Sequence, residues 1–302
     1  MSAPSPLSFR LDAPAKVNLG LRIVGRRDDG YHELESLFVP LDLADAIALR
    51  VEPAPAGSVS LSIGGEIGGA PPGDDNLAVR AAHAFLARAG IAARVAIDLT
   101  KHTPAAAGLG GGSSDAAAVL RGLARAFPAA LPSTALEEVA LSLGADVPYF
   151  LDPRPAWVTG RGERRQPVPD LPSLALLLAN PGEALATAEV YRVFDALAGP
   201  RPPRPAPPHV PWTRLDRQLA DDGALGALLH NDLEEPAVRL CPPIARLRQQ
   251  LRAAGARAVG MSGSGATLYG VFADRASAER AAGRLVLPDR AWARVAATLE
   301  SG

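Results

Sequence analysis

The spacing of apolar residues in the first third of the chain predicts several strands and one amphipathic helix. Apolar and polar residues alternate over Val17–Ile23 and Arg94–Leu99, which is the period of a half-buried strand. Asp75–Arg88 instead has the period of an amphipathic helix. Further strands are predicted at Phe9–Leu11, Leu37–Leu43, Ala46–Val51 and Val59–Ile63, separated by proline, glycine and the polar loop Gly25–Glu33.

The rest of the chain continues to mix helices and strands. Helices are predicted at Ser113–Ala126, Ser133–Leu143, Ile244–Ala254 and Ala276–Leu285, and strands at Ala156–Thr159, Leu174–Leu178, Ala258–Met261, Thr267–Phe272 and Ala291–Ala297. The proline-dense stretch Pro200–Pro211 cannot form a regular helix or a central strand, so we expect a surface loop there. The pattern predicts an α+β protein with an N-terminal domain at 1–160 and a C-terminal domain at 161–302.

Composition limits the kinds of partner. The chain has 302 residues, 48% of them hydrophobic, which is enough for two packed domains. The formal net charge of −1 gives no general attraction to nucleic acid or to an anionic membrane. No signal-peptide pattern or membrane-spanning stretch is found. We therefore expect a cytoplasmic protein with a small-molecule partner, as a monomer or a homodimer.

Cysteine and lysine are rare enough to be informative. Cys241 is the single cysteine, which excludes an internal disulfide framework, and we interpret it as a small buried residue rather than a nucleophile. The histidines show no paired ligand spacing for a transition metal. Lys16 and Lys101 are the only lysines among many arginines. Each lies near a motif described below, which favours a specific need for an ammonium group over chance.

The segment TPAAAGLGGGSSDAAAVL follows a predicted strand and begins a predicted helix. Its glycines allow the backbone to bend sharply and to approach a polyphosphate without obstruction by Cβ atoms. The helix start at Ser113, Ser114 and Asp115 offers unpaired N–H groups and the positive end of the helix dipole to an anion. The segment lacks the Gly-Lys-Ser/Thr ending of a P-loop. The alternative is a flexible turn before a capped helix.

This segment resembles the central motif of the GHMP kinase superfamily, Pro-x-x-x-Gly-Leu-Gly-Ser/Gly-Ser-Ser. The stretches PAKVNLGLRIVGRRDDGYHELESLF (Pro14–Phe38), GADVPYFL (Gly144–Leu151) and GSGATLYG (Gly263–Gly270) are similar to the family within it that phosphorylates a cytidine diphosphate-linked methylerythritol. NDLE at Asn231–Glu234 also fits. The resemblance implies a two-domain GHMP kinase fold with the active site in the cleft between the domains. It further implies phosphorylation of the 2-hydroxyl by ATP with Mg²⁺, in non-mevalonate isoprenoid biosynthesis.

The same resemblance assigns residues to the nucleotide. The implied ATP-binding residues are Pro104, Ala105, Ala106, Ala107, Gly108, Leu109, Gly110, Gly111, Gly112, Ser113 and Ser114, with Asn76, Leu77 and Lys101 lining the adenine. The three alanines depart from relatives, which usually carry another glycine there, and are expected to stiffen the loop entrance. For Lys101, a solvated strand end is the alternative. Ser113, Ser114 and Asp115 offer oxygens to magnesium, and no ligand set is fixed.

Two residues are candidates for the chemistry at the acceptor hydroxyl. Asp146 lies in a turn after a predicted helix, where a carboxylate can accept the hydroxyl proton. Lys16 precedes a predicted strand, where an ammonium group can polarise the same hydroxyl or keep Asp146 ionised. The resemblance assigns them this joint role, with Asp146 as general base. A buried structural ion pair is the alternative.

Aromatic residues point to the acceptor. Tyr31 offers a stacking face and His32 can hydrogen-bond the edge of a base. The resemblance implies that these two recognise cytosine, that Tyr191 stacks on the opposite face, and that Thr187 lies close to the diphosphate. Asn18 and Phe38 are implied in the substrate pocket. Core packing is the alternative for Tyr31 and Phe38. The second glycine loop, GMSGSGATLYG, could close over the substrate diphosphate or the phosphoryl group, and a tight turn is the alternative for it. The open alternatives for function are a homoserine or mevalonate type of GHMP kinase and a non-catalytic ligand sensor.

Overall fold

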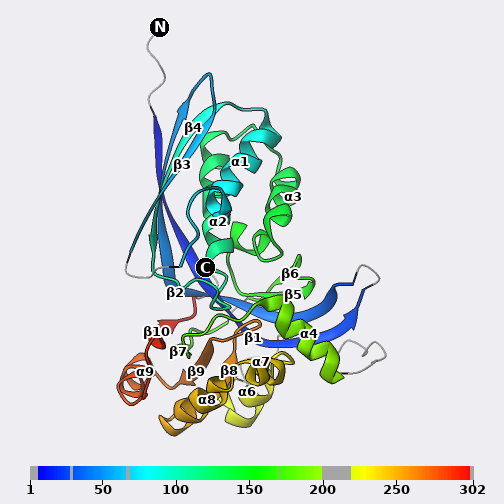
Figure 1. Ribbon diagram of the computed structural model, residues 1–302, viewed down its shortest axis with the longest axis vertical. Helices are drawn as coiled ribbons and strands as arrows, with labels where there is room; N and C mark the ends of the chain where they lie inside the picture. Colours follow the sequence, from blue (N-terminus) through cyan, green and yellow to red (C-terminus); the bar gives the residue numbers. More distant parts are fainter. Residues whose placement is uncertain (1–5, 28–29, 66–68, 170, 199–218, 300–302) are drawn as a thin grey trace. The chain divides into compact units, whose positions relative to one another are not determined.

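In the computed structural model the protein has an α+β fold, and its chain forms two compact units (Figure 1). It describes residues 6–27, 30–65, 69–169, 171–198 and 219–299. The first unit comprises Met1–Ala15, Leu43–Ala105 and Gly110–Pro153, and the second comprises Lys16–Asp42, Ala106–Leu109 and Arg154–Gly302. Each unit is thus built from separate stretches of chain. The predicted division of the sequence into domains at 1–160 and 161–302 stays a prediction.

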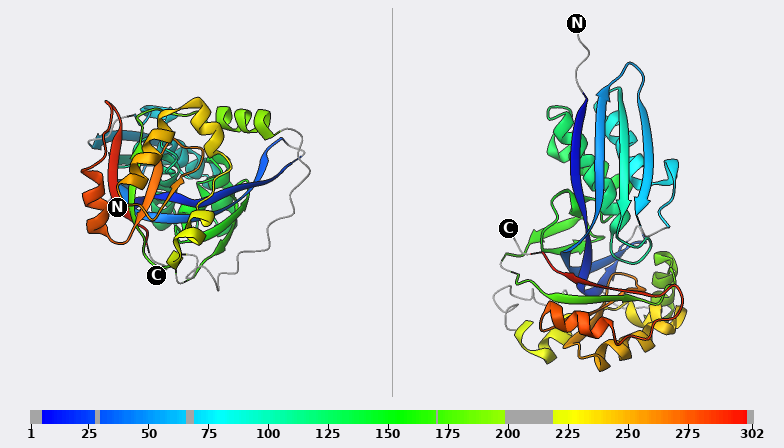
Figure 2. Two further views of the ribbon diagram at one scale, coloured as in Figure 1. Left: turned by 90° about the horizontal axis from the view of Figure 1, so that it is seen from below. Right: turned by 90° about the vertical axis from the view of Figure 1, so that its left-hand side faces the viewer.

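The first unit contains a sheet with helices on one face, as Figure 2 shows. Strand β4 (Ala93–Lys101) pairs in parallel with β3 (Ser58–Gly65) and antiparallel with the second half of β2 (His32–Pro53). The helices are α1 (Leu77–Ala89), α2 (Gly111–Ala126) and α3 (Ser133–Leu143), with short 3-10 turns η1 (Gly73–Asp75) and η2 (Pro148–Leu151). The alternating residues of β4 and the apolar side of α1 are buried, as their periodicity predicts.

The second unit contains the first part of β2 and a separate antiparallel sheet. Strand β1 (Leu7–Arg26) pairs with β2. Strand β2 also pairs antiparallel with β5 (Ala156–Gly160), which in turn pairs with β6 (Arg164–Pro167). The other sheet has the order β10 (Trp292–Ala297), β7 (Ala175–Asn180), β9 (Leu268–Phe272) and β8 (Ala258–Met261). Its helices are α4 (Thr187–Ala198), α6 (Asp222–Leu228), α7 (Glu234–Leu240), α8 (Pro243–Ala253) and α9 (Arg275–Ala282).

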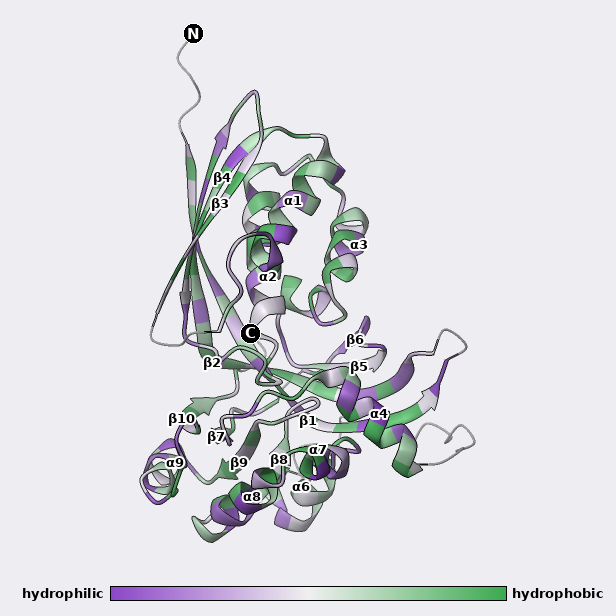
Figure 3. Cartoon of the chain, viewed as in Figure 1, coloured by the Kyte–Doolittle hydropathy of each residue, from purple (hydrophilic) through white to green (hydrophobic). Residues whose placement is uncertain are grey.

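Strands β8 and β9 are strongly hydrophobic and completely buried (Figure 3). One apolar cluster joins these strands to Val190 and Phe194 of α4 and to Leu247 and Leu251 of α8. Cys241 belongs to this cluster, and burial raises the pKa of its thiol to about 11. The interpretation of this cysteine as a small buried residue is therefore confirmed.

Most predicted elements are confirmed, with differences at their ends. The predicted strands Phe9–Leu11 and Val17–Ile23 are parts of one strand, β1, and Leu37–Leu43 and Ala46–Val51 are both parts of β2. Strand β6 and helices α4, α6 and α7 were not expected from the pattern. The predicted loop Pro200–Pro211 lies outside the described residues. In the part of the chain that is described, no helix is both long and apolar enough to cross a membrane.

Candidate active site

The glycine-rich loop connects β4 to α2 and bends where glycine is required. Gly108 and Gly110 have φ angles of 75° and 72°, in the left-handed region. A Cβ atom on Gly108 would lie 2.6 Å from the carbonyl oxygen of Ser262, so no other residue fits there. Helix α2 begins at Gly111 with Gly110 as N-cap and has no side-chain cap, so the expected start at Ser113 is wrong by two residues. The first-turn N–H groups of α2 therefore have no side-chain acceptor at the N-cap position.

Lys101 lies at the end of β4, just before this loop, and is buried between two carboxylates. Its Nζ donates to Oδ2 of Asp45, and also to Oδ2 of Asp115 over 2.8 Å. Oδ1 of Asp45 accepts from the backbone N–H groups of His102 and Thr103 over 2.6 and 2.7 Å. The exposed fraction of Lys101 is 3%, so the alternative of a solvated strand end is wrong. These bonds fasten the residues on both sides of the loop to β2.

Burial in this cluster raises the pKa of Asp115 to about 7. The attraction of Lys101 opposes this shift, and the repulsion of Asp45 adds to it. The pKa of Lys101 is raised by the two carboxylates, against the opposing effect of burial. The cluster holds two acids and one ammonium group, so their charges do not balance within it.

Three buried oxygens at the start of α2 have no hydrogen-bond partner within the described residues. They are Oγ1 of Thr103, Oγ of Ser114 and Oδ1 of Asp115. Buried oxygens without partners are uncommon and call for a partner that the protein does not supply. Hydroxyl and carboxylate oxygens are the ligands that Mg²⁺ prefers. The residues at this position therefore fit a magnesium ion bound together with ATP.

The residues predicted to line the adenine are close to the same helix start. Leu77 is adjacent to Gly112, since a Cβ atom on that glycine would lie 3.6 Å from Cδ1 of Leu77. A Cβ on Gly111 would lie 2.9 Å from Cγ2 of Thr103, so glycine permits this close approach. Asn76 is buried and caps α1, with its Oδ1 accepting from the N–H of Ala78 over 2.9 Å. The structure thus gives Asn76 a structural role beside the predicted one.

Lys16 is the first residue of the second unit and is buried with three other side chains. Its Nζ donates to Oδ1 of Asn18 over 2.6 Å and lies 4.5 Å from the ring centroid of Phe38. Nδ2 of Asn18 donates to Oγ of Ser36 over 2.8 Å. The structure therefore brings Asn18 and Phe38 together with Lys16, and their place in a substrate pocket stays a prediction. Phe38 is 3% exposed, so it packs in the interior and contacts a candidate site residue at the same time.

The second glycine loop contacts the first through Ser262. Oγ of Ser262 donates to the carbonyl oxygen of Gly108 over 2.8 Å, and the N–H of Asn18 donates to the same Oγ over 3.3 Å. The hydroxyl of Tyr269 donates to the carbonyl of Asn18 over 2.6 Å. The second loop thus helps to fix the backbone of β1 and of the first loop, and its predicted role toward the substrate stays a prediction. Sequence reasoning did not identify Ser262.

His32 lies in an aromatic cluster at the start of β2. Its ring stacks on Tyr191 with centroids 4.8 Å apart, and its Nε2 lies 2.7 Å from Oδ1 of Asp195. Tyr191 and Asp195 are four residues apart on α4 and so face the same side. Because Asp195 occupies Nε2, only Nδ1 of His32 is left to meet the edge of a base. Asp195 also lies 3.7 Å from a guanidinium nitrogen of Arg26.

The other predicted substrate residues lie at the surface of the second unit. Tyr31 is 57% exposed, so core packing is wrong for it, and the guanidinium of Arg161 lies 4.9 Å from its ring centroid. Thr187 begins α4, and its Oγ1 lies 3.0 Å from Oγ of Ser264 in the second glycine loop. A threonine hydroxyl beside a glycine loop can donate to a phosphate oxygen.

Asp146 lies in the turn between α3 and η2, where the sequence places it. Its side chain is partly exposed, and burial together with its charge raises the pKa of Tyr149 well above the ordinary value. Asp146 and Tyr149 both belong to the first unit.

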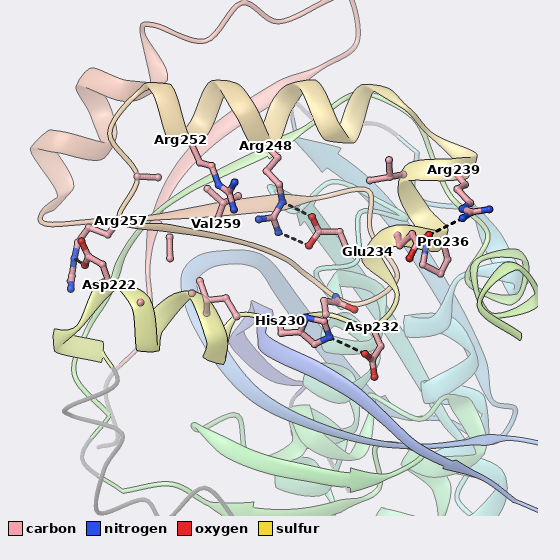
Figure 4. A pocket seen from close by; sticks show the side chains of 18 of the residues that line it. Asp222, His230, Asp232, Glu234, Pro236, Arg239, Arg248, Arg252, Arg257 and Val259 are labelled. Atoms are coloured by element: carbon pink, nitrogen blue, oxygen red, sulfur yellow. Dashed lines mark hydrogen bonds and ion pairs between the residues drawn. The ribbon is translucent and has the colours of Figure 1, made fainter. Parts of the chain in front are cut away.

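A pocket of about 1300 Å³ lies in the second unit between α6, α7 and α8 (Figure 4). Figure 4 shows that most of its charged residues are paired, including Arg248 with Glu234, Arg257 with Asp222 and His230 with Asp232. None of the predicted site residues lines it. We therefore do not assign the candidate site to this pocket.

Known proteins with this architecture define its class. The family models described as GHMP kinases N terminal domain and GHMP kinases C terminal match residues 76–152 and 217–287. A solved homoserine kinase from Cytophaga hutchinsonii has a TM-score of 0.68 at 16% identity, covering 99% of this chain and 96% of that one. At this identity the likeness shows the fold alone. Fold and glycine loop together define a GHMP kinase, which is a phosphotransferase.

The similarity to one family within this class is much greater. The 4-diphosphocytidyl-2-C-methyl-D-erythritol kinase of Anaeromyxobacter dehalogenans is 46% identical over 276 residues, covering 89% of this chain and 82% of the relative. A crystal structure of 4-(cytidine 5'-diphospho)-2C-methyl-D-erythritol kinase has a TM-score of 0.75 at 41% identity, covering 95% of this chain and 99% of that one. The chain belongs to the 4-diphosphocytidyl-2-C-methyl-D-erythritol kinase family.

Proposed function

We propose that this kinase transfers the γ-phosphoryl group of ATP to the 2-hydroxyl of 4-diphosphocytidyl-2-C-methyl-D-erythritol, giving the 2-phosphate and ADP in non-mevalonate isoprenoid biosynthesis. The observation that carries the choice of acceptor is the aromatic cluster of His32 and Tyr191, with the exposed Tyr31 directly before His32 in the chain. Homoserine and mevalonate carry no aromatic ring to stack on such residues, whereas a cytosine does. The names of relatives that match along nearly the whole chain support the same acceptor.

In this proposal the protein supplies a base, a cation and a phosphate cradle. Asp146 accepts the proton of the acceptor hydroxyl while the new bond forms between that oxygen and the γ-phosphorus. The bond from the γ-phosphorus to the bridging oxygen breaks, and ADP leaves. The ammonium of Lys16 polarises the acceptor oxygen. Asn18 and Phe38 hold this ammonium in position.

The nucleotide is proposed to lie on residues 104–114, with Asn76, Leu77 and Lys101 close to the adenine. The first-turn N–H groups of α2 offer hydrogen bonds to the phosphate oxygens. Lys101 acts in this proposal by holding the loop ends together, since its ammonium is taken by two carboxylates. A magnesium ion bound with ATP would neutralise phosphate charge, and Ser114 and Asp115 are the residues that would hold it.

A panel of acceptors tests the proposal. ADP release should be measured with the cytidine diphospho-alcohol, its uridine analogue, homoserine and mevalonate. We expect kcat/KM for the cytidine compound to exceed that for every other acceptor by about tenfold or more. Phosphorus NMR of the product should place the new phosphate on the 2-oxygen. Faster turnover of homoserine or mevalonate, or phosphate on another oxygen, would contradict it.

A further inference from the structure

We propose that Ser36 is a positioning residue, which fixes the side-chain amide of Asn18 so that Asn18 can hold the ammonium of Lys16. This inference rests on the proposed function, because it concerns the lysine assigned there to the acceptor hydroxyl. The exposed fractions are 1% for Ser36, 1% for Asn18 and 4% for Lys16. Water therefore has little access to these groups, and the orientation of the amide depends on its protein neighbours.

The hydroxyl of Ser36 has a single hydrogen, which it donates to a backbone carbonyl. Oγ of Ser36 donates to the carbonyl oxygen of Gly20 over 2.6 Å, and a carbonyl can only accept. Toward Asn18 the same Oγ can therefore only accept. The group 2.8 Å away must be the amide nitrogen, Nδ2, which donates to it. Oδ1 of Asn18 is consequently turned away from Ser36.

The carbonyl of Gly20 is itself held at a position that only glycine fits. Gly20 has a φ angle of 82°, in the left-handed region, and a Cβ atom there would collide with the carbonyl of Leu228. In addition, the N–H of Leu21 donates to the carbonyl of His230 over 2.8 Å. The acceptor for the hydrogen of Ser36 is therefore fixed by the backbone.

The lysine end of the chain of hydrogen bonds requires the same amide orientation. Nζ of Lys16 lies 2.6 Å from Oδ1 of Asn18, and an ammonium group can only donate. If the amide rotated by half a turn, its NH₂ group would face the ammonium, donor against donor. Its oxygen would then face the lone pairs of Ser36. Ser36 and Lys16 therefore favour the same orientation of the amide, and loss of the serine hydroxyl removes one of the contacts that keep it there.

The strands explain why these groups meet. Lys16 and Asn18 are two residues apart on β1, and Ser36 and Phe38 are two apart on β2, which pairs with β1. Residues two apart in a strand lie on one face. Strand β2 therefore contacts Lys16 directly through the ring of Phe38. It also influences Lys16 indirectly, because Ser36 accepts from the amide of Asn18.

Substitution of Ser36 in the full-length enzyme tests this role. Ser36→Ala should lower kcat with the cytidine diphospho-alcohol by about tenfold, because the amide that accepts from the lysine is held less firmly. The KM values for both substrates should stay within about twofold, since Ser36 contacts neither. Ser36→Thr keeps the hydroxyl and should restore kcat. As a matched control, Ser142→Ala removes a hydroxyl that donates to the carbonyl of Val139 over 2.7 Å, and kcat should not change.

A second measurement does not depend on turnover. NMR of ¹⁵N-labelled protein should show slow solvent exchange of the Asn18 side-chain amide in the wild type and faster exchange in Ser36→Ala. An unchanged kcat or an unchanged exchange rate in Ser36→Ala would overturn the role of Ser36 and leave the proposed function intact. If the wild type does not phosphorylate the cytidine compound, the proposed function fails, and the exchange rate still decides whether Ser36 fixes Asn18. Ser36→Cys, with a weaker acceptor of similar size, is used in the same way if Ser36→Ala does not fold.

Discussion

Nζ of Lys101 lies 2.8 Å from Oδ2 of Asp115, a residue fourteen positions further along the chain and on the other side of the glycine-rich loop. The same ammonium donates to Asp45 of β2, which in turn accepts from the N–H groups of His102 and Thr103. The loop therefore leaves and re-enters the first unit at two points joined by one buried ion cluster. Its ends are held without any contribution from the residues that would contact phosphate.

Loss of the ammonium from this cluster should be costly. Lys101→Met would leave the carboxylates of Asp45 and Asp115 buried without their cation, which is expected to lower the free energy of unfolding by about 3–5 kcal/mol. This free energy is measured by urea unfolding, followed by circular dichroism at pH 8. At that pH both acids are ionised in the unfolded chain. Arg94→Met removes an exposed partner of Glu52 and should cost less than about 1 kcal/mol. Equal losses in the two variants would show that the cluster does not stabilise the fold.

The pH dependence of stability should report the proton on Asp115. Its pKa is raised from 3.8 to about 7 by burial, so between these values the folded state holds a proton that the unfolded state has released. Stability contributed through this group therefore falls as pH rises through that window and becomes constant above it. The difference in unfolding free energy between the wild type and Asp115→Asn should fall with a slope of at most about 1.4 kcal/mol per pH unit. A difference that grows with pH would mean that attraction by Lys101 outweighs burial.

A glycine at position 106 should relieve the loop entrance. Ala106 has a φ angle of 52°, a conformation that is unfavourable for a residue with a Cβ atom. Ala106→Gly is therefore expected to raise the free energy of unfolding by about 0.5–1 kcal/mol. Ala105 is outside the left-handed region, so Ala105→Gly should lower the same quantity by about 0.4–1 kcal/mol through the unfolded state. Thermal unfolding of both variants decides, and the same sign for both would contradict the strain at Ala106.

The proposed catalytic residues should separate turnover from nucleotide binding. Asp146→Asn cannot accept the proton of the acceptor, and Lys16→Ala cannot polarise its oxygen, so each should lower kcat by about 10²–10⁴-fold. Neither change removes the loop that is proposed to hold ATP, so the dissociation constant of ATP, measured by titration calorimetry, should be nearly unchanged. A kcat within about tenfold of the wild type would remove that residue from the mechanism.

Asp195 should affect the acceptor and leave ATP unaffected. Asp195→Ala frees Nε2 of His32, which lies 2.7 Å from the carboxylate, and lets the ring leave its place on Tyr191. We expect KM for the cytidine compound to rise roughly fivefold, for the loss of one hydrogen bond of about 1 kcal/mol. KM for ATP should stay constant, and Asp195→Asn, which keeps an acceptor oxygen, should show a smaller change. An effect of Asp195→Ala on ATP alone would contradict this role.

Local patterns predicted the elements whose form depends on near neighbours. Helix α3 and strand β8 have the bounds that their local sequence predicts. Strand β6 was missed because its sequence, RRQP, has no apolar alternation and it becomes a strand by pairing with β5. The merging of two predicted strands into β1 likewise depends on its pairing with β2, which no local period records.

The motifs predicted the loop, and long-range contacts supplied what the motifs left out. Two of the partners that sequence reasoning missed, Asp45 and Asp195, lie 56 and 163 residues from the side chains that they bind. One signal was present for Asp45, because it occupies an inward position of a strand whose next inward residues are Ile47 and Leu49. An acid on an apolar face needs a buried cation. For Asp195 no comparable signal exists, since its helix position is partly exposed.

The interleaving of the two units has a consequence for recombination between relatives. Residues 16–42 and 106–109 belong to the second unit, although they precede most of it in the chain. A chimera made by one crossover near residue 160 would therefore take the sheet β10-β7-β9-β8 from one parent. It would take strand β1 and the glycine-rich loop 106–109 from the other. Ser262 and Asn18, which hydrogen-bond each other, would then come from different parents. We therefore expect a chimera of this chain to keep such contacts only where the three segments of the second unit, 16–42, 106–109 and 154–302, come from one parent.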